Sequence, residues 1–526
     1  AMAATPGSEP EATPRTLWGI NLPHLQPSKL RIIPLAAVIF FEVSGGPVGI
    51  ENSVAAAGPL LAILGFCVFP FVWCIPEALM TAELATAFAE DSGYVAWVNA
   101  AFGEFWGFQE GWWSWVSGVA DNALYPVLMV QYARSLPLLS FLNNKIAGHV
   151  ATLGLTVLLT FVNWLGLSIV GFLSVSLAGF VMVPFLVFVL AGASKVNVDR
   201  LSFVPEFEDI DWRKFLNILF WNLNYWDSAA TLAGEVETPK KTWPKALSLA
   251  AVFTVAAYLL PLIVGIGIDS SPDAWKSWDS DTHNFVDIAR AHIGDWLAGW
   301  IALGVGIANM GLFEAEMSSD SFQLLGMAEK GMLPAALATR SRHGTPTLAI
   351  LLSASGIALI GFEDFEGIIA AENFLYCLAS LLEWGAFLRL RQTRPDLPRP
   401  YKVPLGFFGC CCLAAPSLFF IVLIILLSSW KTIIFGVVFV FIGLLLPPGL
   451  AFVKRQGWVR FIGQDTGDDA QSHSLDNMVQ LPHSHLGQEE SPLLKQGDSE
   501  VAAVATDGSA SSVTSRLPYG TDGIDD

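Results

Sequence analysis

Hydrophobic stretches of about 20 residues recur along most of the chain, and they constrain its fold more than any other feature. Each stretch is long enough to cross the hydrocarbon core of a bilayer as an α-helix. The composition agrees, since 53% of the residues are hydrophobic, 14% are charged and the mean hydropathy is +0.53. We therefore predict an all-α, multi-pass integral membrane protein with twelve transmembrane helices. The predicted spans are 33–57, 60–88, 105–133, 147–165, 168–193, 215–234, 246–268, 294–326, 346–361, 367–389, 404–427 and 432–453.

The distribution of Lys and Arg predicts the orientation of the chain. These residues concentrate in the N-terminal segment, after the sixth, eighth and tenth spans, and after the last span. Because cytoplasmic loops carry an excess of Lys and Arg, both termini are expected in the cytoplasm. We expect residues 1–30 to form a flexible cytoplasmic N-terminus and residues 31–453 a single membrane domain. Residues 454–526 are expected to form a mostly disordered, acidic cytoplasmic tail.

The tail contains one short pattern of interest. Glu489 followed by Leu493 and Leu494 fits an acidic dileucine sorting signal, which a sorting adaptor would bind. Such short patterns also arise by chance, so both interpretations stay open.

Two of the predicted spans carry interruptions, at 40–51 in the first and at 221–228 in the sixth. A helix that breaks inside a bilayer exposes backbone N–H and C=O groups, which is tolerated only where they line a cavity or bind something. Interruptions at corresponding positions of two halves indicate an inverted-repeat transporter with its site near the midplane. We therefore predict a leucine-transporter-like five-plus-five inverted repeat with discontinuous helices 1 and 6. The alternative is that the glycines of the first interruption merely allow close helix packing.

Many carboxylates lie within the predicted spans, whereas no Lys or Arg lies at a comparable depth. The sequence alone thus offers these acids no salt-bridge partner, so they must be protonated, face water or bind an incoming cation. Glu42 and Asp227 flank the two interruptions, and Asp121 and Glu314 lie near the middle of the third and eighth spans. For each acid the alternative is a hydrogen-bonded structural role. We expect proton coupling from Asp227, Glu42, Glu77 and Glu110.

The interruptions also indicate the charge of the substrate. The half-helix that ends near Glu42 presents carbonyl groups, which favour a cation. Pro47 lacks an N–H group and so weakens the next half-helix as a site for a carboxylate. Tyr225 and Trp226 could add cation–π contacts of about 0.5–2 kcal/mol each, although core packing is the alternative for these rings. The predicted substrate-binding residues are Glu42, Ser44, Gly45, Gly46, Gly49, Asp121, Asn224, Tyr225, Trp226, Asp227 and Glu314.

Several motifs resemble the amino acid–polyamine–organocation superfamily. The segment Gly234-Glu235-Val236-Glu237-Thr238-Pro239 is similar to the end of that superfamily's sixth helix, and Arg399-Pro400-Tyr401 to the loop after its tenth. The segments Phe41-Glu42-Val43-Ser44-Gly45-Gly46-Pro47, Ile75-Pro76-Glu77 and Asp121-Asn122-Ala123-Leu124-Tyr125-Pro126 resemble more closely the plant polyamine uptake transporters.

This resemblance implies a proton-coupled symporter of putrescine, spermidine and spermine that also accepts similar organic cations such as paraquat. It further implies that Asp227 senses protons and that Trp226 covers the substrate. The expected partners are a small cationic substrate, protons and membrane lipids, with no nucleic acid, no cofactor and no metal. A plasma-membrane location suits uptake, and an endomembrane or vacuolar location stays open.

Two alternatives remain. A cationic or neutral amino-acid carrier of the same fold would share the spans and the interruptions. A non-transporting membrane sensor that signals through the tail would share the spans alone. An enzyme is not expected, because the spans offer no metal-ligand cluster and no nucleophile–base pair.

Overall fold

The computed structural model describes residues 16–17, 20–21, 29–47, 49–134, 137–269, 274–278, 284–361 and 365–463. Helices account for nearly all of the regular structure in these residues, which confirms the predicted all-α class. The exception is a pair of two-residue antiparallel strands, β1 (Thr16–Leu17) and β2 (Ile20–Asn21). Most of the predicted tail, including Glu489, Leu493 and Leu494, lies outside the described residues.

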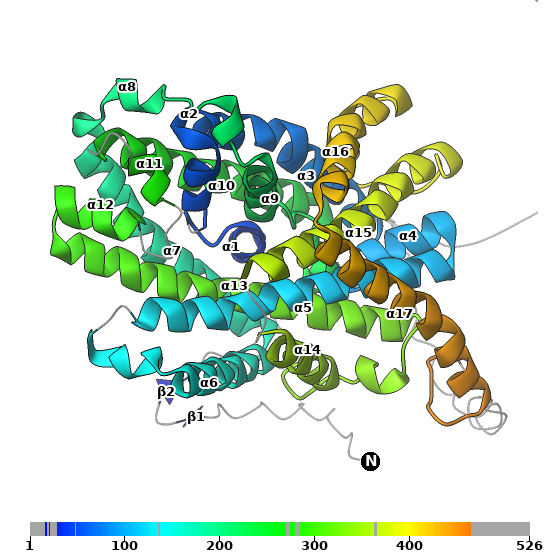
Figure 1. Ribbon diagram of the computed structural model, residues 1–526. Coiled ribbons are helices and arrows are strands. Elements are labelled where there is room, and N and C mark those ends of the chain that lie inside the picture. Colours follow the sequence, from blue (N-terminus) through cyan, green and yellow to red (C-terminus); the bar gives the residue numbers. More distant parts are fainter. Residues whose placement is uncertain are drawn as a thin grey trace, which may run out of the picture. The chain divides into compact units, whose positions relative to one another are not determined.

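The helical elements follow one another with short connections (Figure 1). They are α1 (Ile32–Val43), α2 (Glu51–Phe69), η1 (Pro70–Cys74), α3 (Ile75–Ala87), α4 (Tyr94–Phe102), α5 (Glu104–Arg134), η2 (Pro137–Asn143), α6 (Lys145–Trp164), α7 (Leu167–Gly192), η3 (Ala193–Lys195), α8 (Val198–Leu201), η4 (Phe207–Asp209), α9 (Trp212–Leu223), η5 (Ser228–Glu235), α10 (Pro239–Ile268), α11 (Ala274–Ser277), α12 (Asn284–His292), α13 (Asp295–Glu329), η6 (Ala335–Ala338), α14 (Thr347–Ile360), α15 (Phe365–Thr393), α16 (Phe407–Leu427) and α17 (Trp430–Arg455).

By length and composition, seven helical segments of the described chain could cross a membrane. The longest, Glu51–Ala87, joins α2, η1 and α3, and Gly58 interrupts it with φ +79° directly before Pro59. This kink lies between the first and second predicted spans. Gly166, with φ +135°, likewise separates α6 from α7, between the predicted spans 147–165 and 168–193. The multi-pass class is thus supported, while the number of twelve spans stays a prediction.

Helix α13 provides the centre of the membrane domain, where it packs against α5 and α7 (Figure 1). Helices α5 and α13 run in opposite directions, since Asn122 Nδ2 donates to Phe313 O at 3.5 Å and Gln323 Nε2 donates to Gly111 O at 2.5 Å. Helix α1 packs against α10, α7 and α13, and α15 packs against α5. The two interrupted helices therefore lie beside a long antiparallel pair that carries many of the buried acids.

Candidate functional site

The first interruption is a turn of glycines between α1 and α2. Gly45, Gly46 and Gly49 have φ values of +62°, +115° and +81°, a region that side chains with a Cβ rarely adopt. The Ser44 and Gly45 amides still donate to Phe40 O, at 2.8 and 3.1 Å, so the helix closes with bonds back to its last turn. A glycine-rich sequence is therefore required here to stop the helix and redirect the chain.

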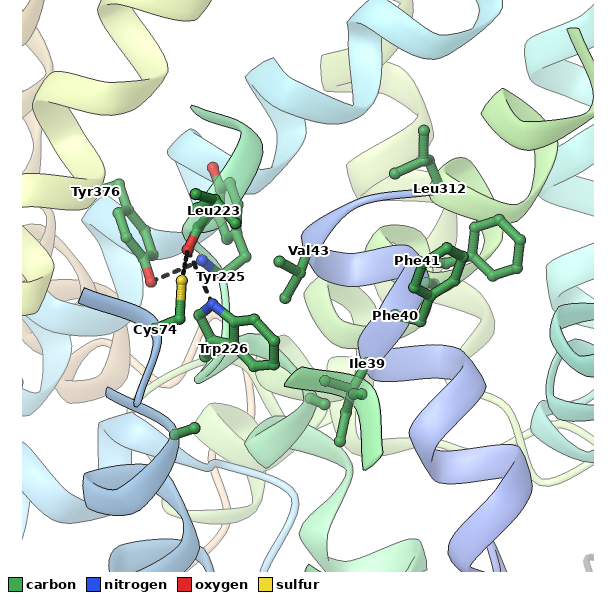
Figure 2. Close-up of a cluster of buried hydrophobic side chains, with 14 of the residues drawn as sticks. Ile39, Phe40, Phe41, Val43, Cys74, Leu223, Tyr225, Trp226, Leu312 and Tyr376 are labelled. Carbon is green, nitrogen blue, oxygen red and sulfur yellow. Dashed lines mark hydrogen bonds between the residues drawn. The ribbon is translucent and has the colours of Figure 1, made fainter. Parts of the chain in front are cut away.

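The second interruption separates α9 from η5. Asn224 is extended and Tyr225 has φ +64°, which is uncommon for a residue other than glycine and stores local strain. The freed backbone groups have partners. Leu223 O accepts from Trp226 Nε1 at 2.9 Å and from Cys74 Sγ at 3.6 Å (Figure 2). Asn222 O accepts from the Tyr258 hydroxyl at 2.9 Å. The break is thus held open by named partners rather than left exposed.

A small cavity lies between the two interruptions. Its volume is about 20 Å³, which is room for about one water molecule, so a larger ligand requires the surrounding helices to separate. Two carboxylates and several aromatic rings contribute to its wall. The lining residues are Glu42, Val43, Ser44, Asp121, Tyr125, Leu128, Trp221, Asn222, Tyr225, Tyr258, Asn309 and Leu312.

Asp121 presents a carboxylate from α5 to this cavity. Its Oδ1 accepts from Trp221 Nε1 at 2.9 Å and its Oδ2 accepts from the Tyr125 hydroxyl. Both donors are neutral, so they orient the carboxylate without compensating its charge. A cation in the cavity would meet a carboxylate that is already aligned.

Asp227, in the second interruption, shares one hydroxyl group with Glu77 of α3. The Tyr376 oxygen lies 2.5 Å from Asp227 Oδ1 and 2.5 Å from Glu77 Oε1, and it accepts from the Tyr225 amide at 3.0 Å. A tyrosine hydroxyl has one hydrogen to donate. Only one carboxylate can receive it, so the other must carry a proton and donate to the tyrosine oxygen. This geometry therefore holds at least one proton on the acid pair.

The same network extends along α15 and α5. The Tyr225 hydroxyl donates to Glu372 Oε1 at 2.9 Å, and Asn224 Nδ2 lies 3.4 Å from the same oxygen. Glu383 interacts with both Asp227 and Glu110, and Ser114 donates to Glu110 at 2.8 Å. The structure thus brings three of the four predicted proton-coupling acids (Asp227, Glu77 and Glu110) into one buried network. The fourth, Glu42, lines the cavity instead.

Of the predicted substrate-binding residues, Glu42, Ser44, Asp121 and Tyr225 line the cavity, whereas Gly45, Gly46, Gly49, Asn224, Trp226, Asp227 and Glu314 do not. Two of the latter have other partners. Glu314 faces α6, where Asn163 Nδ2 lies 3.2 Å from its Oε2 and 2.9 Å from its carbonyl oxygen. Trp226 is fully buried and packs in the hydrophobic core, with its indole N–H bound to Leu223 O (Figure 2). Neither residue belongs to the described cavity wall, whereas Trp221 does.

The expectation that none of the acids within the spans has a salt-bridge partner is wrong for Glu83. Arg391 bonds both Glu83 oxygens, and Arg399 Nε lies 3.0 Å from Oε1. All three side chains are buried, with exposed fractions of 0%, 5% and 3% for Glu83, Arg391 and Arg399. The two arginines come from the end of α15 and the loop after it, and their long side chains reach back to the acid.

Sequence reasoning also missed the acids and the tyrosine of α15. Glu372, Tyr376 and Glu383 recur at intervals of four and seven residues, which places them on one face of a helix. Polar groups at this spacing in a predicted span were a signal that this face meets other polar groups rather than lipid.

A second ionic cluster lies outside the membrane spans. Arg340, after α13, bonds Asp91 Oδ2 and Glu235 Oε1, both at 2.7 Å, and so links the turn before α4 to the end of η5. Burial raises the pKa of Asp91 to about 7, and the neighbouring charge of Glu235 acts in the same direction, whereas Arg340 opposes both. Burial lowers the pKa of Arg340, but its bonds to Glu235 and Asp91 outweigh this effect and raise the pKa above its ordinary value.

A model of the amino acid permease family matches residues 31–444. A probable polyamine transporter of Arabidopsis thaliana is 50% identical over 440 residues, which are 83% of this chain and 90% of the relative. The polyamine transporter PUT1 of Oryza sativa subsp. japonica is 50% identical over 431 residues, which are 82% and 80% of the two chains. A probable agmatine/putrescine antiporter of Lactococcus lactis subsp. lactis is 23% identical over 401 residues, which are 71% and 81% of the two chains. The chain therefore belongs to the amino acid permease family and is a multi-pass membrane permease rather than an enzyme, as the resemblance of its motifs predicts.

Proposed function

We propose that this protein is a polyamine transporter that takes up putrescine, spermidine, spermine and similar organic cations, such as paraquat, together with protons. One observation carries the proposal. The cavity between the two interrupted helices is lined by two carboxylates, Glu42 and Asp121, and its described wall contains no Lys or Arg. The names of the two relatives at 50% identity support the same class of substrate.

The chemistry of the cavity suits a chain of methylene groups that carries ammonium groups. Carboxylates accept hydrogen bonds from an ammonium, and such charge-assisted bonds are about twice as strong as neutral ones. The rings of Trp221, Tyr125 and Tyr225 offer apolar area for the methylene groups and π-faces for the charges. In an alternating-access cycle of a leucine-transporter-like, twelve-helix fold, the helices around the cavity would separate first toward one side and then toward the other.

Proton coupling rests on the acid pair Asp227 and Glu77. The Tyr376 hydroxyl joins the two groups, so a proton can pass between them by exchange of one hydrogen across this hydroxyl. Asp227 also lies in the second interruption, where a change of its charge acts directly on the backbone that faces the cavity. The excess of Lys and Arg in the assigned cytoplasmic segments supports cytoplasmic termini, and uptake suits the plasma membrane.

Uptake of radiolabelled spermidine into proteoliposomes tests this function. We expect an inwardly directed proton gradient to drive accumulation, and Asp121→Asn and Glu42→Gln to reduce it at least about tenfold. Glu104→Gln, which neutralises an exposed acid at the start of α5, is the matched control. An uptake rate that is the same with and without the proton gradient would refute proton coupling. Competition by leucine or arginine as strong as that by spermidine would instead identify an amino-acid carrier.

A further inference from the structure

Three buried carboxylates meet beside the cavity, where α1, α5 and α13 pack together. They belong to Glu42, Glu316 and Asp320, each of which is 3% exposed. Glu316 lies within hydrogen-bonding reach of Glu42 and interacts electrostatically with Asp320. Of the three, only Glu42 lines the cavity, and Glu316 and Asp320 continue the acidic cluster from it along α13.

Each of these carboxylates has an acceptor without a partner. Glu42 Oε2, Glu316 Oε2 and Asp320 Oδ2 are buried, and none of them receives a hydrogen bond from the described residues. The other Glu42 oxygen accepts from the Ser319 hydroxyl, which carries no charge. Among the ion pairs of the described chain, none involves these three acids.

The shape of α5 leaves room for these acids. Helix α5 has a glycine, Gly118, opposite them, and a Cβ at this position would overlap the carboxylate oxygens of Glu316 and Asp320. The two acids are therefore directed at the α5 backbone, beside Glu42. Buried acceptors cost free energy when they lack donors, so this arrangement calls for a cationic donor or for protons.

The spacing of the acids favours an ammonium over a metal ion. The described His, Cys, Asp and Glu side chains form no group of three or more that could hold a metal ion. Glu316 and Asp320 are four residues apart on α13, so their carboxylates lie on one face of the helix, where both can contact one ammonium group. A polyamine whose first ammonium lies at Asp121 carries its next one about 5–6 Å away, across three or four methylene groups.

We propose that Glu316 and Asp320, beside Glu42, bind a second ammonium group of a polyamine whose first ammonium occupies the cavity at Asp121. This inference rests on the proposed transport of polyamines. The subsite adds affinity only for substrates with two or more ammonium groups, so it distinguishes polyamines from monoamines. Ser319 and Gly118 complete it, the first by holding Glu42 and the second by leaving space.

Competition binding on the purified, full-length protein tests the subsite. Radiolabelled spermidine is displaced by butylamine, putrescine or spermidine, for the wild type and for Glu316→Gln and Asp320→Asn. We expect each variant to bind spermidine at least about tenfold more weakly than the wild type, because it loses one charge-assisted contact. Its affinity for butylamine should stay within about twofold of the wild-type value. Asp121→Asn should weaken the binding of butylamine and of spermidine, and Glu104→Gln should change neither affinity. Thermal melting of each variant checks that it folds.

Three outcomes would overturn the subsite. Variants that bind spermidine like the wild type would exclude a contact, and variants that weaken butylamine and spermidine equally would exclude a subsite for a second charge. If sodium or potassium displaces spermidine from the wild type but not from Glu316→Gln, the acids bind an inorganic cation instead.

If Glu316→Gln and Asp320→Asn do not fold, Glu316→Asp and Asp320→Glu replace them. These variants keep the negative charge but change its position, so the length of the diamine that binds most tightly should change. The same order of affinities for diamines of different length in the variants and the wild type would refute the proposal. A wild type that binds no polyamine at all would instead refute the proposed function itself.

Discussion

The hydroxyl group of Tyr376 provides the sharpest test of the proton pathway. Replacing Tyr376 with Phe removes the oxygen that joins Asp227 to Glu77 and keeps the ring, which packs against Tyr225 with centroids 4.5 Å apart. The substitution therefore separates the role of the hydroxyl in proton transfer from the role of the ring in packing.

The cost follows from the bonds that meet at this oxygen. Hydrogen bonds to charged groups contribute about 1.5–3 kcal/mol, and a buried group left without a partner costs about 1–3 kcal/mol. The variant loses the bond to whichever carboxylate is ionised and strands the Tyr225 amide, which donates to the hydroxyl at 3.0 Å. Taken together, these losses predict a destabilisation of about 2–5 kcal/mol. The two acids also lose the group that holds their shared proton between them.

Proteoliposomes that contain a pH-sensitive dye and receive radiolabelled spermidine report both fluxes at once. We expect Tyr376→Phe to reduce the protons moved per spermidine, and to flatten the pH dependence of uptake. Tyr401→Phe is the matched control, because Tyr401 lies in the loop before α16 and outside the cavity wall. A folded Tyr376→Phe protein with the wild-type proton ratio and pH profile would refute the role of this hydroxyl.

Three further predictions follow from the described contacts. Asp91→Asn should stabilise the protein more at pH 8 than at pH 5 in thermal melting. The pKa of Asp91 is about 7 when folded against an ordinary 3.8, so the wild type loses stability as the pH rises from about 4 to 7, and about 2 kcal/mol of this loss falls between pH 5 and pH 7. Equal shifts at both pH values would contradict this. Glu83→Gln should lower stability by about 3–5 kcal/mol, since it leaves Arg391 and Arg399 buried without an anion, and an unchanged melting temperature would count against this pair. Gly49→Ala should impair folding and uptake, because φ is +81° and the Trp221 ring occupies the space of the new methyl group; normal uptake would show that the turn tolerates a side chain.

The sequence allowed the helix breaks to be predicted because their causes are local. Gly45, Gly46 and Gly49 permit backbone angles that end α1, and the structure confirms an interruption there. Asn224 and Asp227, polar residue types that favour breaks in a helix, mark the second interruption, although the Asp227 side chain caps no helix there. Features that depend on a few neighbouring residues can be predicted without knowledge of the tertiary structure.

The partners of the acids could not be predicted, because they depend on the rotation of each helix about its axis. Glu314 and Glu316 are two residues apart, which is about 160° of rotation away from each other on an α-helix. One therefore faces Asn163 of α6 while the other faces Glu42, although both lie at similar depth. Depth alone, which singled out Glu314 near the middle of the eighth span, cannot separate these cases.

The two interruptions each carry one carboxylate, and their neighbours differ in a way that supports different tasks. Asp227 shares the Tyr376 hydroxyl with Glu77, and a hydroxyl with one hydrogen can pass a proton but offers no further acceptor for the several donors of an ammonium. Glu42 faces the cavity and keeps a buried oxygen without a donor, and Glu316, which lies beside it outside the cavity wall, also keeps one. We therefore propose that the second interruption carries the proton and the first binds the substrate. Because both interruptions line one cavity, a substrate held at Glu42 and a proton held at Asp227 act on the same opening and closing motion.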